Sequence, residues 1–156
     1  MKKIQMVDLK SQYDFIRKEV AASMESVFES SSYINGPMVQ EFQKELELYV
    51  GVKHVIPCAN GTDALQIALM GLELKPGDEI ITADFTFAAT VEVISLLHLK
   101  PVLVDVHPRT FNIDPEAIEK AITKKTKAII PVHLFGQCAE MAEILRIAEK
   151  YNLYVV

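Results

Sequence analysis

Residues 79–106, EIITADFTFAATVEVISLLHLKPVLVDV, contain two short apolar runs separated by a longer amphipathic stretch. The runs near 79–83 and 101–105 have the length of strands, and the stretch near 87–98 is predicted to be a helix. A strand, a helix and a second strand in this order are typical of a βαβ unit, in which the two strands are parallel.

The same alternation continues on both sides of this segment. Further strands are expected near 54–58, 127–132 and 152–156, and further helices near 62–72, 115–122 and 138–150. Asp114 and Pro115 suit the N-cap and the first position of one of these helices. Strands alternating with helices predict an α/β fold with a mostly parallel sheet and flanking helices.

The first fifty residues follow a different pattern. An amphipathic helix is predicted from Ser11 to about Glu29, and the stretch SSSYING then interrupts it. A second helix is predicted to begin at Pro37 and to end before Gly51, which suits a C-cap. We therefore expect an N-terminal helical arm over residues 1–50 and a sheet-containing domain over residues 51–156.

Composition and charge narrow the class of protein. The 156 residues suffice for one ordinary domain, and 50% of them are hydrophobic, which allows a substantial core. Sixteen basic and 21 acidic residues give a net charge of −5 without a Lys/Arg block, so nucleic acid is not an expected partner. No stretch of about 18 apolar residues occurs, and charged residues interrupt the signal-like N-terminus, so no membrane association is expected.

Residue types that bind metals are scattered along the chain. Cys58 and Cys138 have no Cys or His at metal-ligand spacing and are expected to be free thiols in a reducing compartment. The four histidines show no zinc-like spacing either. We therefore expect a cytoplasmic protein with no metal site.

Residues 58–62, CANGT, stand where a predicted strand gives way to a helix, but match neither the Rossmann fingerprint nor a Walker A loop. Gly61 would let a phosphate approach the backbone, free N–H groups at the helix start would face it, and the Thr62 hydroxyl would add a donor. The alternative, favoured on this stretch alone, is a simple cap in which Thr62 or Asp63 satisfies the first turn. The Asp63 carboxylate is expected to point away from any bound phosphate.

Other candidate residues also follow predicted strands. Phe85 and Phe87 could stack on a flat ligand, although a place in the core is favoured for both. Asp105 could contact a ligand, although capping of the following loop is favoured. For His133, which is followed by Gly136 and Gln137, a hydrogen-bonded structural role is favoured.

Ligands of open α/β sheets bind beyond the carboxyl ends of the strands, where all of these residues fall. The residues alone therefore indicate an α/β domain that binds a planar phosphorylated ligand. There is no G-x-S-x-G elbow, so hydrolase chemistry has little support.

Seven segments, in this order, resemble the beginning of the DegT/StrS-type sugar aminotransferases: VDLKSQY, YINGPMVQEFQKELELYVGVKHVI, ANGTDALQIAL, GDEIITADFTFAAT, PVLVDVHPRTFNIDPEAIEKAIT, TKAIIPVHLFGQ and LYVV. These proteins are pyridoxal 5'-phosphate (PLP) enzymes of fold type I, with an architecture related to that of aspartate aminotransferase. The resemblance covers nearly the whole chain and implies an incomplete large domain of this architecture.

The resemblance also implies roles for individual residues. Gly61 and Thr62 match the residues that hold the cofactor phosphate, and Phe87 matches the aromatic residue that stacks on the pyridine ring. Gln137 matches a polar residue close to the cofactor, and His133 is implied to support its loop.

On the substrate side, Tyr33 and Asn35 match a loop that lies near the active site in the family. In the family, an Asp soon after the segment LYVV pairs with the pyridine nitrogen, and a Lys far downstream forms the Schiff base with the cofactor. Neither matching position lies within these 156 residues. The resemblance therefore implies no catalytic residue in this chain, which is expected to be inactive and poorly soluble alone.

The resemblance implies that the intact protein is a homodimer that transfers an amino group, with glutamate as donor, to a nucleotide-linked keto sugar. Two alternatives stay open. One is a sugar dehydratase of the same fold, in which a histidine replaces the downstream lysine. The other is a non-catalytic phosphate-binding or regulatory module.

Overall fold

The computed structural model of the chain describes residues 6–156. It contains two compact units, of which the first ends at Pro57 and the second runs from Cys58 to Val156. The first five residues of the predicted helical arm lie outside the described residues. No helix among residues 6–156 combines the length and the hydropathy that a passage through a bilayer requires.

The first unit contains two helices, α1 (Leu9–Ser30) and α2 (Pro37–Val50). The carboxylate of Asp8 caps α1 by accepting a 3.0 Å hydrogen bond from the N–H of Ser11. Pro37 is the first residue of α2, and Gly51 ends it in a left-handed conformation with φ of 73°. Both predicted helices, and the roles of Pro37 and Gly51, are confirmed.

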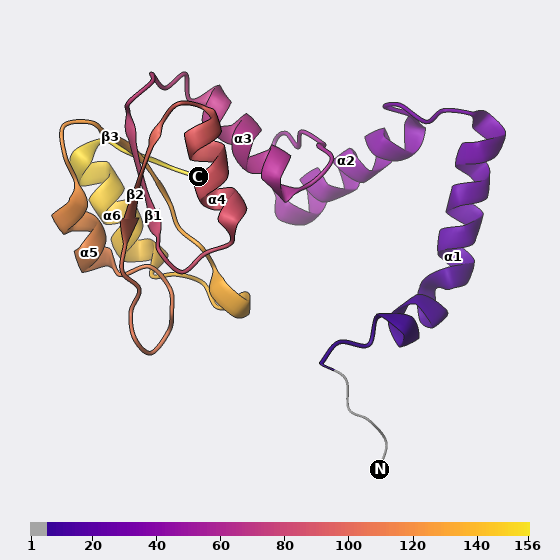
Figure 1. Cartoon of the computed structure of the whole chain (residues 1–156). Helices are drawn as coiled ribbons and strands as arrows, with labels where there is room; N and C mark the ends of the chain where they lie inside the picture. Colours follow the sequence, from indigo (N-terminus) through magenta and orange to yellow (C-terminus); the bar gives the residue numbers. More distant parts are fainter. Residues whose placement is uncertain (1–5) are drawn as a thin grey trace, which may run out of the picture. The chain divides into compact units, whose positions relative to one another are not determined.

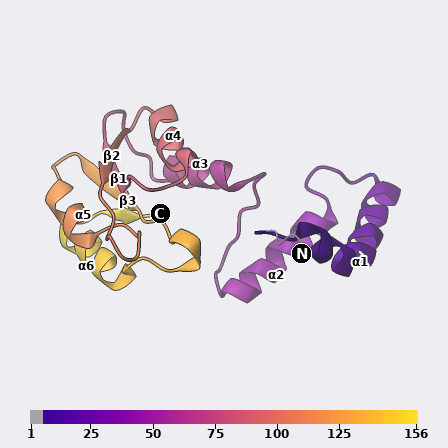
Figure 2. The ribbon, with the colours of Figure 1, turned by 60° about the horizontal axis from the view of Figure 1, so that its bottom comes forward.

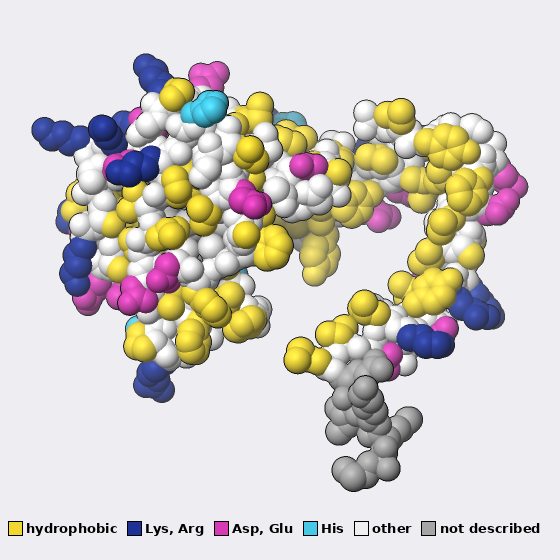
Figure 3. Space-filling view, viewed as in Figure 1, with side chains coloured by type: hydrophobic (Ala, Val, Ile, Leu, Met, Phe, Trp, Pro, Cys, Tyr) yellow, Lys and Arg dark blue, Asp and Glu magenta, His cyan; other side chains and the backbone are white. Residues whose placement is uncertain are grey.

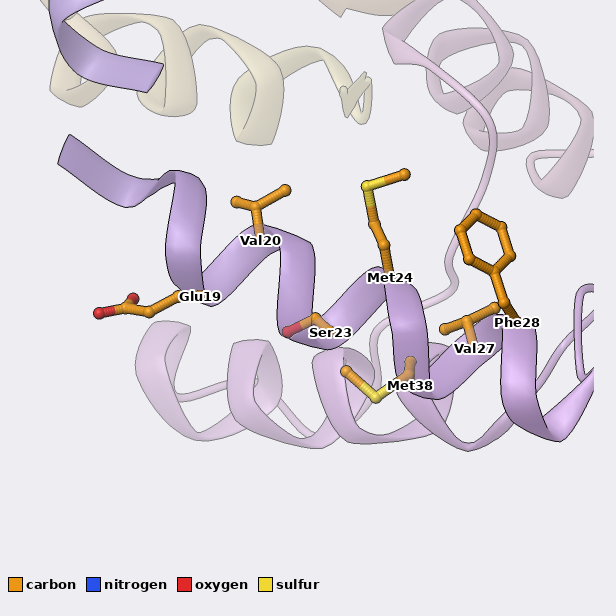
Figure 4. Close-up of a pocket in the computed structure, with 7 residues that line it drawn as sticks. All are labelled: Glu19, Val20, Ser23, Met24, Val27, Phe28 and Met38. Carbon is orange, nitrogen blue, oxygen red and sulfur yellow. The ribbon is translucent and has the colours of Figure 1, made fainter. Parts of the chain in front are cut away.

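Neither α1 nor α2 contains a buried residue, and Figure 3 shows hydrophobic side chains along their surfaces. The close-up in Figure 4 shows α1 and α2 lining an open hollow with the apolar side chains of Val20, Met24, Val27, Phe28 and Met38. The apolar residues of α1 and α2 therefore do gather on one side of each helix, as the sequence pattern predicted. Among the described residues, however, nothing packs over their apolar faces closely enough to bury them.

The second unit is built on four parallel strands in the spatial order β2-β1-β3-β4. Figure 1 labels three of them, β1, β2 and β3. The strands are β1 (Glu79–Ala83), β2 (Lys100–Val104), β3 (Thr126–Ile130) and β4 (Tyr154–Val155). The helices are α3 (Gly61–Gly71), α4 (Ala88–Leu96), α5 (Pro115–Ala121) and α6 (Met141–Tyr151), with a short 3₁₀ turn, Leu134–Gly136. The predicted α/β fold with a parallel sheet is confirmed, as are the four helices.

Each face of the sheet carries its own hydrophobic cluster. α3 and α4 cover one face and α5 and α6 cover the other (Figures 1 and 2). Ile81 and Ile129 pack with Ile144 of α6, whereas Ile80 packs with Val93 of α4. Because successive strand residues point to opposite faces, neighbouring isoleucines of β1 serve different clusters. This packing of helices on both faces holds the sheet in place, and with it the edge at which the strands end.

The strand predicted near 54–58 is wrong, because these residues pair with none of the four strands. A strand is held by hydrogen bonds to a neighbouring strand, and none of the described strands makes such a ladder with this segment. Instead, the N–H of Val55 donates a 3.0 Å hydrogen bond to the carboxylate of Glu47 in α2. Residues 51–57 therefore group with the first unit rather than with the sheet.

Glu79 is a buried carboxylate at the N-terminal edge of the sheet, where its residue is 5% exposed. It accepts hydrogen bonds from the hydroxyl of Thr123 and, at 3.0 Å, from the ammonium of Lys100. The hydrogen bond from Thr123, and then the bond and charge of Lys100, hold the pKa of Glu79 below its usual value. This side chain thus ties β1 to β2 and to the turn before β3.

The stability of the second unit should depend on the Glu79 carboxylate. A pKa that is lower in the folded than in the unfolded chain gives stabilisation that is present above the unfolded pKa and lost as pH falls through the folded pKa. Glu79→Gln should lower the free energy of unfolding at neutral pH by about 1 to 3 kcal/mol, because the amide removes the negative charge and replaces one of the two acceptor oxygens, which face Lys100 and Thr123, by an NH₂ donor. Urea unfolding followed by circular dichroism, at neutral and at acidic pH, measures both effects.

Glu116→Gln is the matched control, since the side chain of Glu116, which pairs with Lys120, is 82% exposed. This variant should unfold at nearly the urea concentration of the wild type. Equal losses in the two variants would mean that the Glu79 contacts contribute no more than a surface ion pair.

Candidate functional site

The carboxyl ends of the strands define one edge of the second unit. Because β1, β2 and β3 are parallel, the loops that follow them, residues 84–87, 105–114 and 131–140, leave the sheet at the same edge. α4 begins directly after the first of these loops. α3 packs beside α4 and is joined by a short connection to the start of β1, so its first residue also lies toward this edge.

Asn60 caps α3. Its side-chain oxygen accepts a 3.0 Å hydrogen bond from the N–H of Asp63, and its backbone oxygen accepts a 3.1 Å bond from the N–H of Ala64. Its amide nitrogen also donates to the carboxylate of Asp63 at 3.1 Å. The prediction of Thr62 or Asp63 as the cap is therefore wrong, because the residue before the helix already satisfies the first turn.

This cap leaves two donors at the start of α3. No described residue accepts a hydrogen bond from the N–H of Gly61 or of Thr62. A Cβ built on Gly61 would meet no atom within 4 Å, so the space in front of this residue is open. Two free N–H groups, the positive end of a helix and the half-buried Thr62 form a donor set that fits a phosphate group.

Phe85, Phe111 and Phe135 form an aromatic cluster that joins the three loops. The ring centroid of Phe85 lies 5.9 Å from that of Phe111 and 6.5 Å from that of Phe135. Phe87, which directly precedes α4, is 79% exposed, and Phe85 is 47% exposed. The favoured core position is therefore wrong for both, since the loop after β1 carries them beyond the covered faces of the sheet.

Asn112 is the site-forming residue that the sequence analysis missed. Its residue is 3% exposed, and its side chain bonds the backbone at Leu134, Gln137 and Cys138, which lie 22, 25 and 26 residues away along the chain. A buried amide that joins two loops leaves no local pattern in the sequence. The only available signal is a polar residue directly before the apolar Ile113, which by itself indicates no ligand site.

Two phenylalanines in these loops have left-handed backbones. The φ angles are 58° for Phe111 and 52° for Phe135, a region that bulky residues rarely occupy. Such a conformation costs about 1 to 3 kcal/mol and persists only where neighbouring contacts hold it. The loops at this edge are therefore held in a specific shape rather than left to adopt their preferred one.

His133 supports the loop that carries Gln137, in agreement with the expected structural role. Its Nδ1 accepts a 3.1 Å hydrogen bond from the N–H of Ala139, which closes the segment between them. Asp105 also has the favoured structural role. Its carboxylate accepts a 2.7 Å bond from the N–H of Val106, and its backbone oxygen accepts one from the N–H of Asp114.

The predicted site residues are only partly brought together. Gln137 and Phe87 lie in loops that the aromatic cluster connects, whereas no hydrogen bond or ring contact among residues 6–156 joins Gly61 or Thr62 to either of them. Tyr33 and Asn35 belong to the first unit, in the turn between α1 and α2.

Metal-ligating side chains do not gather in the described part of the chain. Residues 6–156 contain no group of three His, Cys, Asp or Glu side chains able to hold an ion. Cys58 and Cys138 are both free and exposed.

The family model described as the DegT/DnrJ/EryC1/StrS aminotransferase family matches residues 14–156. The chain belongs to this family. Among curated relatives, UDP-2-acetamido-2-deoxy-3-oxo-D-glucuronate aminotransferase of Pseudomonas aeruginosa is 50% identical over 98% of the chain and 43% of its own length. A "Pleiotropic regulatory protein" of Geobacillus stearothermophilus is 46% identical over 98% of the chain and 41% of its own length. The chain therefore spans about two fifths of the curated relatives it matches.

Solved structures of aminotransferases have the same fold. The S. venezuelae DesV structure, in complex with a ketimine intermediate, has a TM-score of 0.96 at 35% identity. This match covers 99% of the present chain and 42% of the DesV chain. The NtdA structure from Bacillus subtilis, with bound cofactor PMP, has a TM-score of 0.95 at 35% identity. This match covers 99% of the present chain and 36% of the NtdA chain. The structure of E. coli GDP-4-keto-6-deoxy-D-mannose-3-dehydratase with bound hydrated PLP has a TM-score of 0.81 at 27% identity. This match covers 86% of the present chain and 36% of the dehydratase chain. The chain thus has the fold of part of a fold type I aminotransferase.

The assignment of the α3 cap can be tested by removing each candidate side chain. Asn60→Ala should lower the free energy of unfolding of the second unit by about 1 kcal/mol, because the N–H of Asp63 loses its acceptor. Thr62→Val should have little effect, since the Thr62 side chain makes no capping bond. Urea unfolding compares the two variants, and a larger loss for Thr62→Val would show that the cap lies at Thr62.

Proposed function

We propose that this family member is the N-terminal part of a PLP-dependent aminotransferase that transfers an amino group from glutamate to a nucleotide-linked keto sugar. The observation that carries the proposal is the open start of α3, where the N–H groups of Gly61 and Thr62 have no acceptor among the described residues. Solved relatives of the same fold hold PMP or PLP, whose phosphate is the anion that such a helix start suits.

In the proposed site, the backbone N–H groups of Gly61 and Thr62 and the Thr62 hydroxyl bind the cofactor phosphate. The Asp63 carboxylate does not oppose this anion strongly, because the Asn60 amide donates to it. The exposed ring of Phe87, directly before α4, stacks on the pyridine ring. Gln137 orients the cofactor from the loop after β3.

The substrate side is proposed to include Tyr33 and Asn35. Bound PLP supplies the electron sink that lets an amino group leave one substrate and enter another. The residues of this chain bind and orient the cofactor, whereas the Asp that pairs with the pyridine nitrogen and the Lys of the Schiff base are proposed to lie downstream of residue 156. The 156 residues alone are therefore proposed to be inactive.

The proposed substrate follows from the name of a relative, and the proposed cellular location follows from the cysteines. The curated relative at 50% identity is named for a UDP-linked oxo sugar, so a nucleotide-linked keto sugar is the proposed acceptor. We further propose that residues 1–50 form an arm, that residues 51–156 begin the large domain, and that the intact protein is a homodimer. Two exposed free thiols support a cytoplasmic setting.

Sugar dehydration is the second candidate function. It is favoured by one specific observation, the likeness to the E. coli dehydratase at 27% identity and a TM-score of 0.81. The same phosphate and ring contacts would serve both reactions. Only the product separates them, because a dehydratase removes water and leaves no new amine on the sugar.

Gly61→Ala in the full-length protein tests the proposal. The added Cβ meets no protein atom within 4 Å, so stability should be unchanged or raised by up to about 1 kcal/mol. The same Cβ occupies the space of a phosphate held against the backbone, so PLP affinity should fall by at least about tenfold. PLP titration followed by visible absorbance measures affinity, and oxoglutarate release from glutamate with a UDP-linked keto sugar measures amino transfer.

Gly71→Ala is the matched control, since it adds a Cβ in equally open space at the other end of α3. It should bind PLP as the wild type does. Equal affinity in the two variants would leave the start of α3 as a simple cap and contradict the proposal. A dehydrated product without a new amine would favour the second candidate function.

A further inference from the structure

Asn112 uses its whole side chain to hold one backbone segment. Its amide nitrogen donates 3.1 Å hydrogen bonds to the backbone oxygens of Gln137 and Cys138, and its side-chain oxygen accepts a 2.9 Å bond from the N–H of Leu134. Both amide hydrogens and the oxygen are therefore occupied. Because the residue is buried, water does not compete for these bonds.

These bonds are the polar link between two loops. Asn112 lies in the loop after β2, and residues 134–138 lie in the loop after β3. Among the described residues, every hydrogen bond between these two loops runs through the Asn112 side chain. The remaining bond at the end of the segment, from Ala139 to His133, lies within the second loop.

The segment that Asn112 holds is strained and faces the aromatic cluster. Phe135 has a φ angle of 52°, which bulky residues rarely adopt, whereas Gly136 takes its φ of 84° without strain. The Phe135 ring contacts Phe85, whose loop also carries Phe87. A side chain that fixes residues 134–138 therefore also fixes the spacing between Gln137 and the loop of Phe87.

We propose that Asn112 is a positioning residue for the cofactor site, which holds Gln137 at the carboxyl edge of the sheet by tying residues 134–138 to the loop after β2. This proposal rests on the proposed function, because it takes Gln137 to orient PLP. Only a carboxamide of this length supplies two donors to two carbonyls and an acceptor to an N–H. A carboxylate of the same size supplies acceptors alone and repels both carbonyls.

Asn112→Asp in the full-length protein separates positioning from packing, because it keeps the volume and removes both donors. Amide exchange at residues 134–139 should become at least about tenfold faster, while the amides of β3 keep their protection. PLP affinity should fall by at least about tenfold, because Gln137 is no longer held. Hydrogen exchange with mass spectrometry and PLP titration by absorbance give the two readouts.

Lowering the pH should partly restore both properties in N112D. Protonation of the new carboxyl group removes its charge and returns one O–H donor, so loop protection and PLP affinity should rise relative to a control at the same pH. Asn152→Asp is that control, since it makes the same chemical change at the exposed end of α6. If N112D does not fold, N112S, which keeps one donor, is measured in its place and should show the same losses without pH rescue.

Two results would overturn the role of Asn112 alone. One is N112D with the exchange rates and PLP affinity of N152D, and the other is a loosened loop with unchanged PLP affinity. If the wild-type protein binds no PLP, the proposed function is contradicted, and the role of Asn112 is contradicted with it. The wild-type titration therefore separates the two failures.

Discussion

The parallel pairing of β1 with β2 on one side and with β3 on the other is the constraint on which the second unit depends. All five residues of β1 are buried, and its two faces feed two separate hydrophobic clusters. Parallel strands must be joined by crossovers, so each strand is followed by a loop at the same edge and a helix that returns across the sheet. The gathering of three loops at one edge follows from this pairing.

Local contacts then give that edge its chemical character. Asn60 satisfies the first turn of α3 and leaves the N–H groups of Gly61 and Thr62 free, while no side chain fills the space in front of Gly61. The loops beside it are held by the Phe85 cluster and by Asn112. Asn60 therefore serves both stability and site geometry, whereas Glu79 stabilises the opposite edge of the sheet, away from the candidate site.

The sequence predicted the features that local chemistry determines. Helix starts at Pro37 and Pro115 and the helix end at Gly51 follow from proline and glycine geometry, and apolar runs located β1, β2 and β3. The strand near 54–58 was wrong because pairing depends on a neighbour that the described chain does not provide. The role of Asn112 was missed because its partners lie 22 to 26 residues away along the chain. The Asn60 cap is a local contact, which the sequence analysis assigned to Thr62 or Asp63 instead.

The position of the cofactor phosphate tests the central claim most directly. A crystal structure of the full-length protein with PMP should place the phosphate oxygens about 3 Å from the backbone nitrogens of Gly61 and Thr62. The Phe87 ring should then lie against the pyridine ring. A phosphate bound elsewhere, with both N–H groups facing only solvent, would contradict the assignment of this edge as the cofactor site.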